Sequence, residues 1–178
     1  MGASATAPQF YDTDLLANIF DVLPVPVLVI DKDVRIIDFN VATARLLESV
    51  PFAVVRQGAG ETFACIHSSE APGGCGHGET CHECVIRSSV REAFESGMAC
   101  RKLGRMDLVR AGKAERFEFL VTAAPIPDES EPIALLMLED ATELWRLLAA
   151  GPNPPNPASF FPGSKDPAKA RDHKTGNS

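Results

Sequence analysis

The sequence has little positive charge and no long hydrophobic run. Its 17 Lys and Arg residues stand against 24 Asp and Glu residues, which gives a formal net charge of −7 at pH 7. An acidic surface repels phosphate backbones, so we expect no binding of nucleic acid. The longest apolar stretch, residues 23–30, is too short to span a bilayer and contains two prolines, so we expect no membrane span either.

Signatures of targeting and catalysis are also missing. The first ten residues, MGASATAPQF, lack the basic start and the apolar core of a secretory signal. We therefore expect a cytoplasmic protein, whose thiols stay reduced. There is no Gly-x-Ser-x-Gly, no Walker loop and no dinucleotide-binding fingerprint. These absences predict that the chain is not an enzyme.

The patterns that are present predict one α+β domain over residues 10–150. Apolar residues spaced three or four apart predict helices, and β-branched runs or strict alternation predict strands. Asn40 and Asp140 are suited to cap the helices that follow them, and Glu143 stands three residues after Asp140 as in a capping box. The expected helices are 10–23, 40–47, 80–96 and 140–150, and the expected strands are 25–30, 34–39, 101–109, 114–124 and 133–138.

The two ends differ in composition from this domain. Residues 1–9 are small and polar, and six of the 14 prolines lie between positions 152 and 167. Such segments bury too little apolar surface to offset the entropy lost on ordering. We therefore expect residues 1–9 and the Pro-rich residues 151–178 to be disordered.

Two stretches carry a resemblance to a known family. Residues 20–47, FDVLPVPVLVIDKDVRIIDFNVATARLL, contain a helix end, a proline-containing turn and a hairpin closing on Asp38-Phe39-Asn40. Residues 132–148, PIALLMLEDATELWRLL, are a strand leading through Asp140-Ala141-Thr142 into a helix. The chain resembles a PAS domain over about residues 10–148.

The resemblance implies a PAS fold, with a five-stranded antiparallel sheet, helices on one face and a C-terminal signalling helix. It also implies a stand-alone sensory or signal-transduction module. Its partner would be a protein such as a kinase or regulator, with a homodimer through the N- and C-terminal helices. The Asn-Cys-Arg-Phe-Leu-Gln stretch of blue-light flavin PAS domains is absent here. A haem-ligating histidine on the long helix has its nearest counterpart in His82.

The cysteine segment, residues 61–84, holds four of the five cysteines. Cys65, Cys75, Cys81 and Cys84 have the spacing C-x9-C-x5-C-x2-C. If the long helix begins near position 80, Cys81 and Cys84 share one face at its N-terminus, where the helix dipole lowers a thiol pKa. The glycines among residues 73–78 let the backbone wrap closely around a compact group.

Several functions fit this segment. The first is an iron–sulfur cluster, expected as 4Fe–4S, held by the four cysteines and sensing redox state or oxygen. This resembles oxygen-sensing kinases with a four-cysteine PAS domain, which have two CxxC pairs where this chain has one. The second is an interaction domain without sensing, stabilised by zinc that is held by the four thiolates or by three of them with His67, His77 or His82. A metal-free thiol switch, or cysteines with no joint role, are further alternatives. A redox enzyme using a Cys81–Cys84 dithiol is disfavoured, because the βαβ context of such dithiols is missing.

Overall fold

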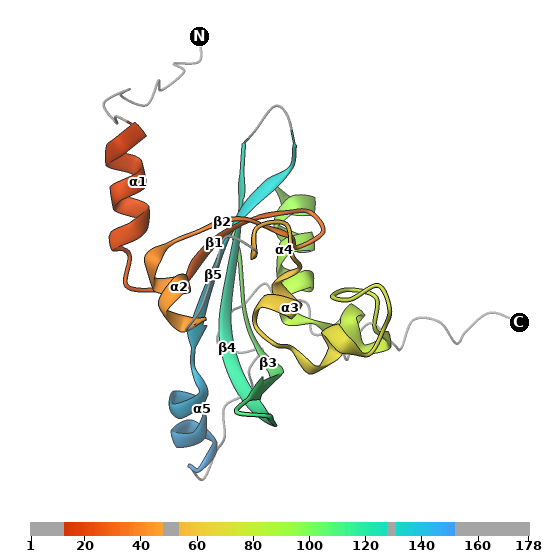
Figure 1. Ribbon diagram of the computed structural model, residues 1–178. Coiled ribbons are helices and arrows are strands. Elements are labelled where there is room, and N and C mark those ends of the chain that lie inside the picture. The colour runs from red at the N-terminus through yellow and green to blue at the C-terminus, as the bar shows by residue number, and fades with distance from the viewer. Residues whose placement is uncertain (1–12, 48–53, 128–130, 152–178) are drawn as a thin grey trace, which may run out of the picture.

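The computed structural model describes residues 13–47, 54–127 and 131–151 (Figure 1). The two segments expected to be disordered, residues 1–9 and 151–178, lie outside the described residues except for Gly151. No helix in the described ranges combines the length and the apolar character needed to cross a membrane.

The N-terminal part follows the order that the sequence predicted, with shorter elements. Helix α1 spans Thr13–Val22, strands β1 and β2 span Val27–Asp31 and Ile36–Phe39, and helix α2 spans Val41–Leu46. The predicted cap is confirmed, because the Asn40 side chain accepts a hydrogen bond from the Thr43 N–H at 3.0 Å. Strand β1 forms the expected antiparallel hairpin with β2.

The rest of the chain contains short helical turns, one long helix, three strands and a last helix. These are α3 (Ala59–Thr62), the 3-10 turns η2 (Ile66–Ser69) and η3 (Glu79–Glu83), α4 (Val85–Ser96), β3 (Cys100–Arg110), β4 (Lys113–Ile126), β5 (Ile133–Asp140) and α5 (Thr142–Ala149). The last three strands form the predicted antiparallel meander.

The long helix begins later than predicted. A 3-10 turn occupies Glu79–Glu83, in which the Cys84 N–H donates to the Cys81 carbonyl at 3.3 Å. Cys84 itself is extended, with φ −59° and ψ 125°, so α4 starts only at the next residue. The expectation that Cys81 and Cys84 share one face of an α-helix start is therefore wrong. The predicted end is confirmed, since Gly97 has φ 68° and closes the helix in the left-handed conformation.

The cap predicted for the last helix is confirmed in part. The Asp140 carboxylate accepts a hydrogen bond from the Thr142 N–H at 2.8 Å, so it satisfies one of the free donors at the start of α5. Glu143 does not complete a capping box. It pairs instead with Arg146, one turn further along the helix, at 2.9 Å.

The five strands form one antiparallel sheet in the order β2-β1-β5-β4-β3. This is the five-stranded antiparallel sheet that the resemblance predicted. Helices α3 and α4 lie on one side of the sheet, whereas α1 and α5 are drawn on the other side (Figure 1). The α+β class is therefore confirmed, and the side with α3 and α4 carries the main core.

The core lies between α4 and the inner face of the sheet. Alternate residues of β5 point inward, so Ala134, Leu136 and Leu138 are almost fully buried, as a period of two requires. From the helix, Val90 and Ala93 pack against them within one cluster. Burial of such side chains stabilises the fold by roughly 1.5–3 kcal/mol for each large aliphatic group.

Candidate functional site

The cysteine segment is attached to the sheet at its first cysteine. Cys65 forms an isolated antiparallel bridge with Leu108 of β3, and the Val109 N–H donates to the Ala64 carbonyl at 2.8 Å. The Cys65 N–H donates to the Gly60 carbonyl at 2.8 Å, which ties the same point to α3. The start of the segment is therefore fixed on both sides by backbone hydrogen bonds.

Three of the four predicted thiols lie within electrostatic reach of one another. The pKa of the Cys65 thiol is raised, mainly by burial. Neighbouring backbone N–H groups lower this pKa in part, and the Cys84 and Cys75 thiols raise it. Burial likewise raises the pKa of Cys84, against two backbone N–H groups of α4 that lower it. The prediction that the helix start lowers the pKa is wrong for Cys84, because its removal from water outweighs the helix N–H groups.

A glycine-rich loop holds Cys75 in place. The Cys75 N–H donates to the Glu61 carboxylate at 2.5 Å, across 14 residues of sequence. Gly76 follows with φ 94°, a conformation that side chains disfavour, and a Cβ at this position would overlap the guanidinium of Arg87. A side chain at position 76 would therefore displace the Arg87 guanidinium from its present place.

Arg87 is the residue of this site that the sequence did not reveal. Its Nη2 donates to the carbonyl of Asp33 at 3.1 Å and to that of Cys75 at 2.9 Å, and lies 3.7 Å from the Cys75 sulfur. One side chain thus joins α4, the β1–β2 turn and the cysteine loop. Its position three residues after the last cysteine is the only local signal, and a solvated helix arginine gives the same signal.

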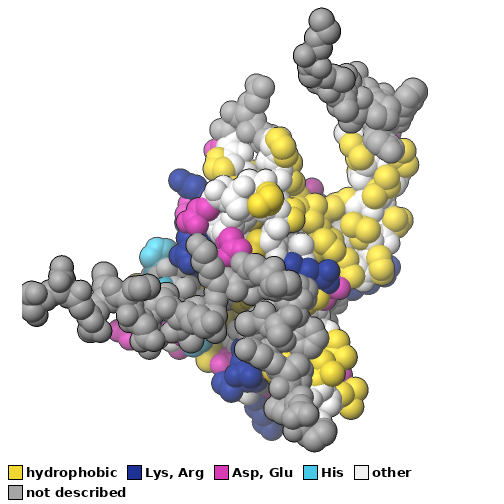
Figure 2. All heavy atoms as spheres, turned by 180° about the vertical axis from the view of Figure 1, so that it is seen from behind, with side chains coloured by type: hydrophobic (Ala, Val, Ile, Leu, Met, Phe, Trp, Pro, Cys, Tyr) yellow, Lys and Arg dark blue, Asp and Glu magenta, His cyan; other side chains and the backbone are white. Residues whose placement is uncertain are grey.

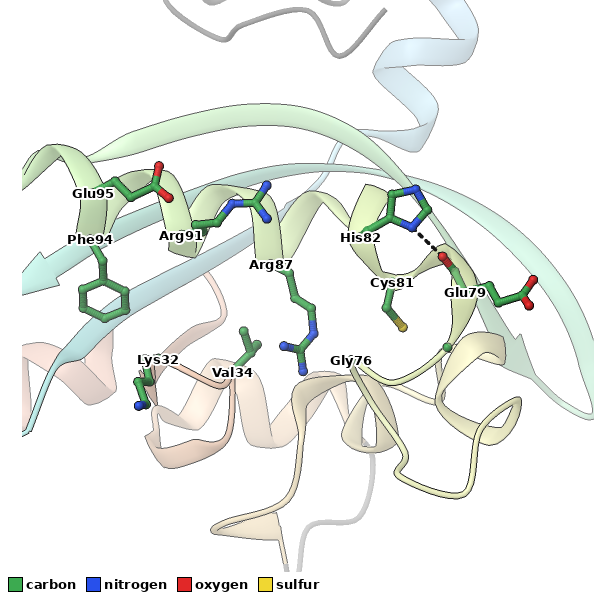
Figure 3. A pocket seen from close by; sticks show the side chains of 11 residues that line it. Lys32, Val34, Gly76, Glu79, Cys81, His82, Arg87, Arg91, Phe94 and Glu95 are labelled. Carbon is green, nitrogen blue, oxygen red and sulfur yellow. Dashed lines mark hydrogen bonds between the residues drawn. The ribbon is translucent and has the colours of Figure 1, made fainter. Parts of the chain in front are cut away.

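The fourth thiol belongs to the wall of a hollow beside α4. Cys81 is 8% exposed, and its sulfur points into this space together with the side chain of Arg87 (Figure 3). The hollow has a volume of about 460 Å³. Its lining residues come from the β1–β2 turn, the cysteine segment and α4, namely Lys32, Val34, Gly76, Gly78, Glu79, Cys81, His82, Arg87, Arg91, Phe94 and Glu95.

The three histidines considered as substitute ligands have partners other than sulfur. The Nδ1 atom of His67 lies 2.8 Å from the Glu70 carboxylate. The Nδ1 atom of His82 lies 2.5 Å from the Glu79 carbonyl oxygen, and its ring is largely exposed. His77 is exposed on the loop, where its ring packs on Gly73.

The side chains do not form a closed ligand set. Within the described ranges, no group of three or more Cys, His, Asp or Glu side chains is arranged to hold a metal ion. All five cysteines are free thiols. The four-cysteine ligand set therefore stays a prediction that depends on further convergence of these side chains. Cys100, the fifth cysteine, is buried in β3.

Comparison with known proteins agrees with the fold. Residues 14–76 match the sequence family described as the PAS domain. No curated protein sequence matches the chain significantly.

Solved structures extend this agreement beyond the matched residues. The PAS domain of nitrogen regulation protein NR(II) from Vibrio parahaemolyticus has a TM-score of 0.50 at 18% identity, over 72% of this chain and 99% of that one. The PAS domain of a protein from Colwellia psychrerythraea has a TM-score of 0.52 at 22% identity, over 73% and 97%. An RNA-binding light-oxygen-voltage receptor has a TM-score of 0.53 at 19% identity, over 81% of this chain but 36% of that one.

The sheet order and the solved structures show that this chain has the PAS fold, and residues 14–76 match the PAS family. It is a particular variant, in which a segment with four cysteines lies between α3 and α4 and faces β3.

Proposed function

We propose that this PAS domain is a sensory module whose four cysteines hold an iron–sulfur cluster and report redox state or oxygen to a partner protein. The observation that carries the proposal is the mutual proximity of Cys65, Cys75 and Cys84. These thiols come from three separate turns of the segment, yet they act on one another electrostatically.

The donor chemistry favours this group. Four thiols are the usual ligand set of iron–sulfur clusters, and backbone N–H groups of a glycine-rich loop can bond to cluster sulfur. Partial burial at Cys65 and Cys84 would limit solvent access, which is one of the factors that set the potential of such a centre. Zinc, and a metal-free thiol pair, use the same residues and are the alternatives that the experiment below separates.

A route from the segment to the C-terminal helix supports a signalling role. The segment is bonded to β3 at Cys65, and β3 pairs with β4 along its whole length. On β4, the N–H of Glu118 donates to the Thr142 hydroxyl at 3.0 Å, and the Glu118 carbonyl accepts from the Ala141 N–H at 2.8 Å. A displacement of β3 is therefore conveyed by hydrogen bonds to the first residues of α5.

The terminal helices present the surface on which we expect the partner to bind. Helix α1 has no buried residue, and helix α5 buries only its first. Figure 2 shows hydrophobic side chains gathered over these helices, on the side behind the view of Figure 1. The exposed apolar residues are Leu15, Leu16, Ile19 and Val22 on α1, and Leu144, Leu147 and Leu148 on α5.

We propose that a second copy of the chain covers these stripes, because both helices carry self-complementary apolar faces of the kind that two-fold dimers bury. Replacement of Leu16 by Glu, or of Leu147 by Glu, should shift the protein from dimer to monomer in light scattering coupled to size exclusion. Replacement of Val109 by Glu, at an exposed apolar position on β3, is the matched control and should leave the mass unchanged. A wild-type protein that is monomeric at all concentrations would refute the dimer and leave a different protein as the partner.

Anaerobic purification with metal analysis tests the iron–sulfur proposal. We expect a brown protein with iron and sulfide in near-equal amounts, and we expect the replacement Cys75→Ser to remove both. The matched control is Cys100→Ser, which changes a thiol in β3 outside the segment and should leave the metal content intact. A colourless protein with one zinc per chain would replace the cluster by zinc, and metal-free protein whose thiols oxidise reversibly would leave a thiol switch.

A further inference from the structure

The hollow beside α4 concentrates positive charge in an acidic protein. Lys32, Arg87 and Arg91 all line it, although the whole chain has a net charge of −7. None of these three cations forms an ion pair within residues 13–47, 54–127 and 131–151. Unpaired cations that share one concave surface raise the local concentration of anions.

The carboxylates on the rim do not neutralise these cations. In Figure 3 the carboxylates of Glu79 and Glu95 point away from the space between Arg87 and Val34. Neither forms an ion pair with the three cations in the part of the chain that the structure describes. The space around Arg87 is therefore left with positive charge.

Arg87 also keeps a donor without a partner. Its Nε atom is buried and has no hydrogen-bond partner among the described residues, whereas Nη2 binds two carbonyl oxygens. Buried donors in folded proteins are almost always satisfied, so an unmatched one at the wall of a hollow indicates a missing acceptor. A guanidinium donor of this kind forms a charge-assisted hydrogen bond to a carboxylate or phosphate oxygen.

The apolar wall of the hollow has an unusual backbone. Val34 has φ 63°, a left-handed conformation that is rare for a β-branched residue and costs of the order of 1–3 kcal/mol. The turn is held in this form by the Asp31 carboxylate, which accepts from the N–H groups of Asp33 and Arg35 at 2.9 and 2.8 Å. Strain of this kind gathers at sites that hold a ligand. Phe94 adds an aromatic surface to the same hollow.

We propose that this hollow binds a small organic anion. Its carboxylate or phosphate group is held by Arg87, Arg91 and Lys32, and its apolar part packs on Val34 and Phe94. A volume of about 460 Å³ is within the range of small-molecule sites. None of these five residues is a proposed cluster ligand, although Cys81 lines the same hollow, so the anion proposal can fail without the cluster proposal failing.

Calorimetric titration of the full chain at low salt tests the proposal with four probes. Benzoate and phenyl phosphate carry both an anionic group and an apolar ring, benzamide carries the ring without the charge, and inorganic phosphate carries the charge without the ring. We expect benzoate or phenyl phosphate to bind, and the one that binds more tightly identifies the preferred anionic group. Benzamide and inorganic phosphate should bind at least tenfold more weakly than that probe. Equal binding of benzamide and benzoate would overturn the proposal.

Two charge-matched variants locate the site. Arg91→Gln removes an exposed cation at the hollow and should weaken binding of the tighter anion about tenfold, which is the usual effect of losing one charge-assisted contact. Arg146→Gln removes the same charge from α5, outside the hollow, and should have no effect. If both variants weaken binding equally, or if neither does, the anion is attracted by overall charge or binds elsewhere, and the assignment is wrong. Arg91 is exposed and forms no described ion pair, so its replacement does not threaten folding.

Discussion

The side chain of Asn40 is buried and forms hydrogen bonds through both its oxygen and its nitrogen. It is 1% exposed, and its Oδ1 accepts from the N–H of Val27 at 3.1 Å and from the N–H of Thr43 at 3.0 Å. Its Nδ2 lies 3.2 and 3.0 Å from the carbonyl oxygens of Phe20 and Val25. One amide therefore caps α2, completes the start of β1 and holds the connection that leads from α1.

The replacement Asn40→Ala removes all of these bonds at once. Loss of the helix cap costs about 1 kcal/mol. The Val27 N–H then stays buried without an acceptor, which costs about 2 kcal/mol more. We expect the free energy of unfolding to fall by about 3 kcal/mol, a large part of the 5–15 kcal/mol that is typical of a folded domain. Urea denaturation followed by circular dichroism measures this difference.

Two further variants separate the contributions. Serine is as good a helix cap as asparagine but is too short to reach the carbonyls before β1, so Asn40→Ser should recover about 1 kcal/mol of the loss. Asp38→Ala changes an exposed side chain two residues away and should stay within about 0.5 kcal/mol of wild type. A loss below about 1 kcal/mol for Asn40→Ala would refute the reasoning, because water would then be satisfying the groups taken here as buried.

Three other predictions concern the loop, the sheet and the core. In urea denaturation, Gly76→Ala should destabilise the protein more than Gly112→Ala. Both positions have positive φ, but only at position 76 would the new Cβ overlap a neighbour, the guanidinium of Arg87. Equal losses would mean that only backbone strain matters. The hydrogen bond from Arg116 lowers the pKa of Asp107, so the pair stabilises the fold above the ordinary pKa of about 4 and this contribution is lost as the pH falls through the lowered value. Asp107→Asn should therefore be less stable than wild type at pH 7, with the gap closing in acid, and a gap that persists there would contradict the assignment. Phe63→Ala should cost about 3–5 kcal/mol in the same denaturation assay, because Phe63 is the largest fully buried side chain among the described residues. A loss near zero would mean that water replaces the ring.

The sheet and its helices could be predicted because their signals are local. Alternation in β5, the β-branched runs of the first hairpin and the cap at Asn40 each depend on residues within one element. The bounds were less accurate: β1, β2, α2 and α5 were predicted one or two residues too long at an end and α4 five residues too long, whereas β3, β4 and β5 extend one or two residues beyond their predicted ends. The resemblance in residues 20–47 and 132–148 supplied the topology that local patterns cannot give.

For the candidate site, the sequence predicted the types of ligand residue but not how they are arranged. The start of α4 shifted to Val85 because a 3-10 turn forms over Glu79–Glu83, and such turns carry no periodic pattern. Arg87 binds a carbonyl 54 residues away and another 12 residues away, so its role depends on where the glycine loop passes. That path is set by backbone conformations such as φ 94° at Gly76, which the residue type permits but does not dictate.

The bridge between Cys65 and Leu108 has a consequence for how the molecule meets other chains. β3 is the outermost strand on its side of the sheet, and the cysteine segment supplies the only backbone bonds to its outer edge among the described residues. An uncovered strand edge is a template for pairing with a strand from another chain. Opening of the cysteine segment, by loss of a bound metal or by oxidation of its thiols, would therefore expose a pairing edge. The residues of the proposed centre therefore also cover part of the outer edge of the sheet.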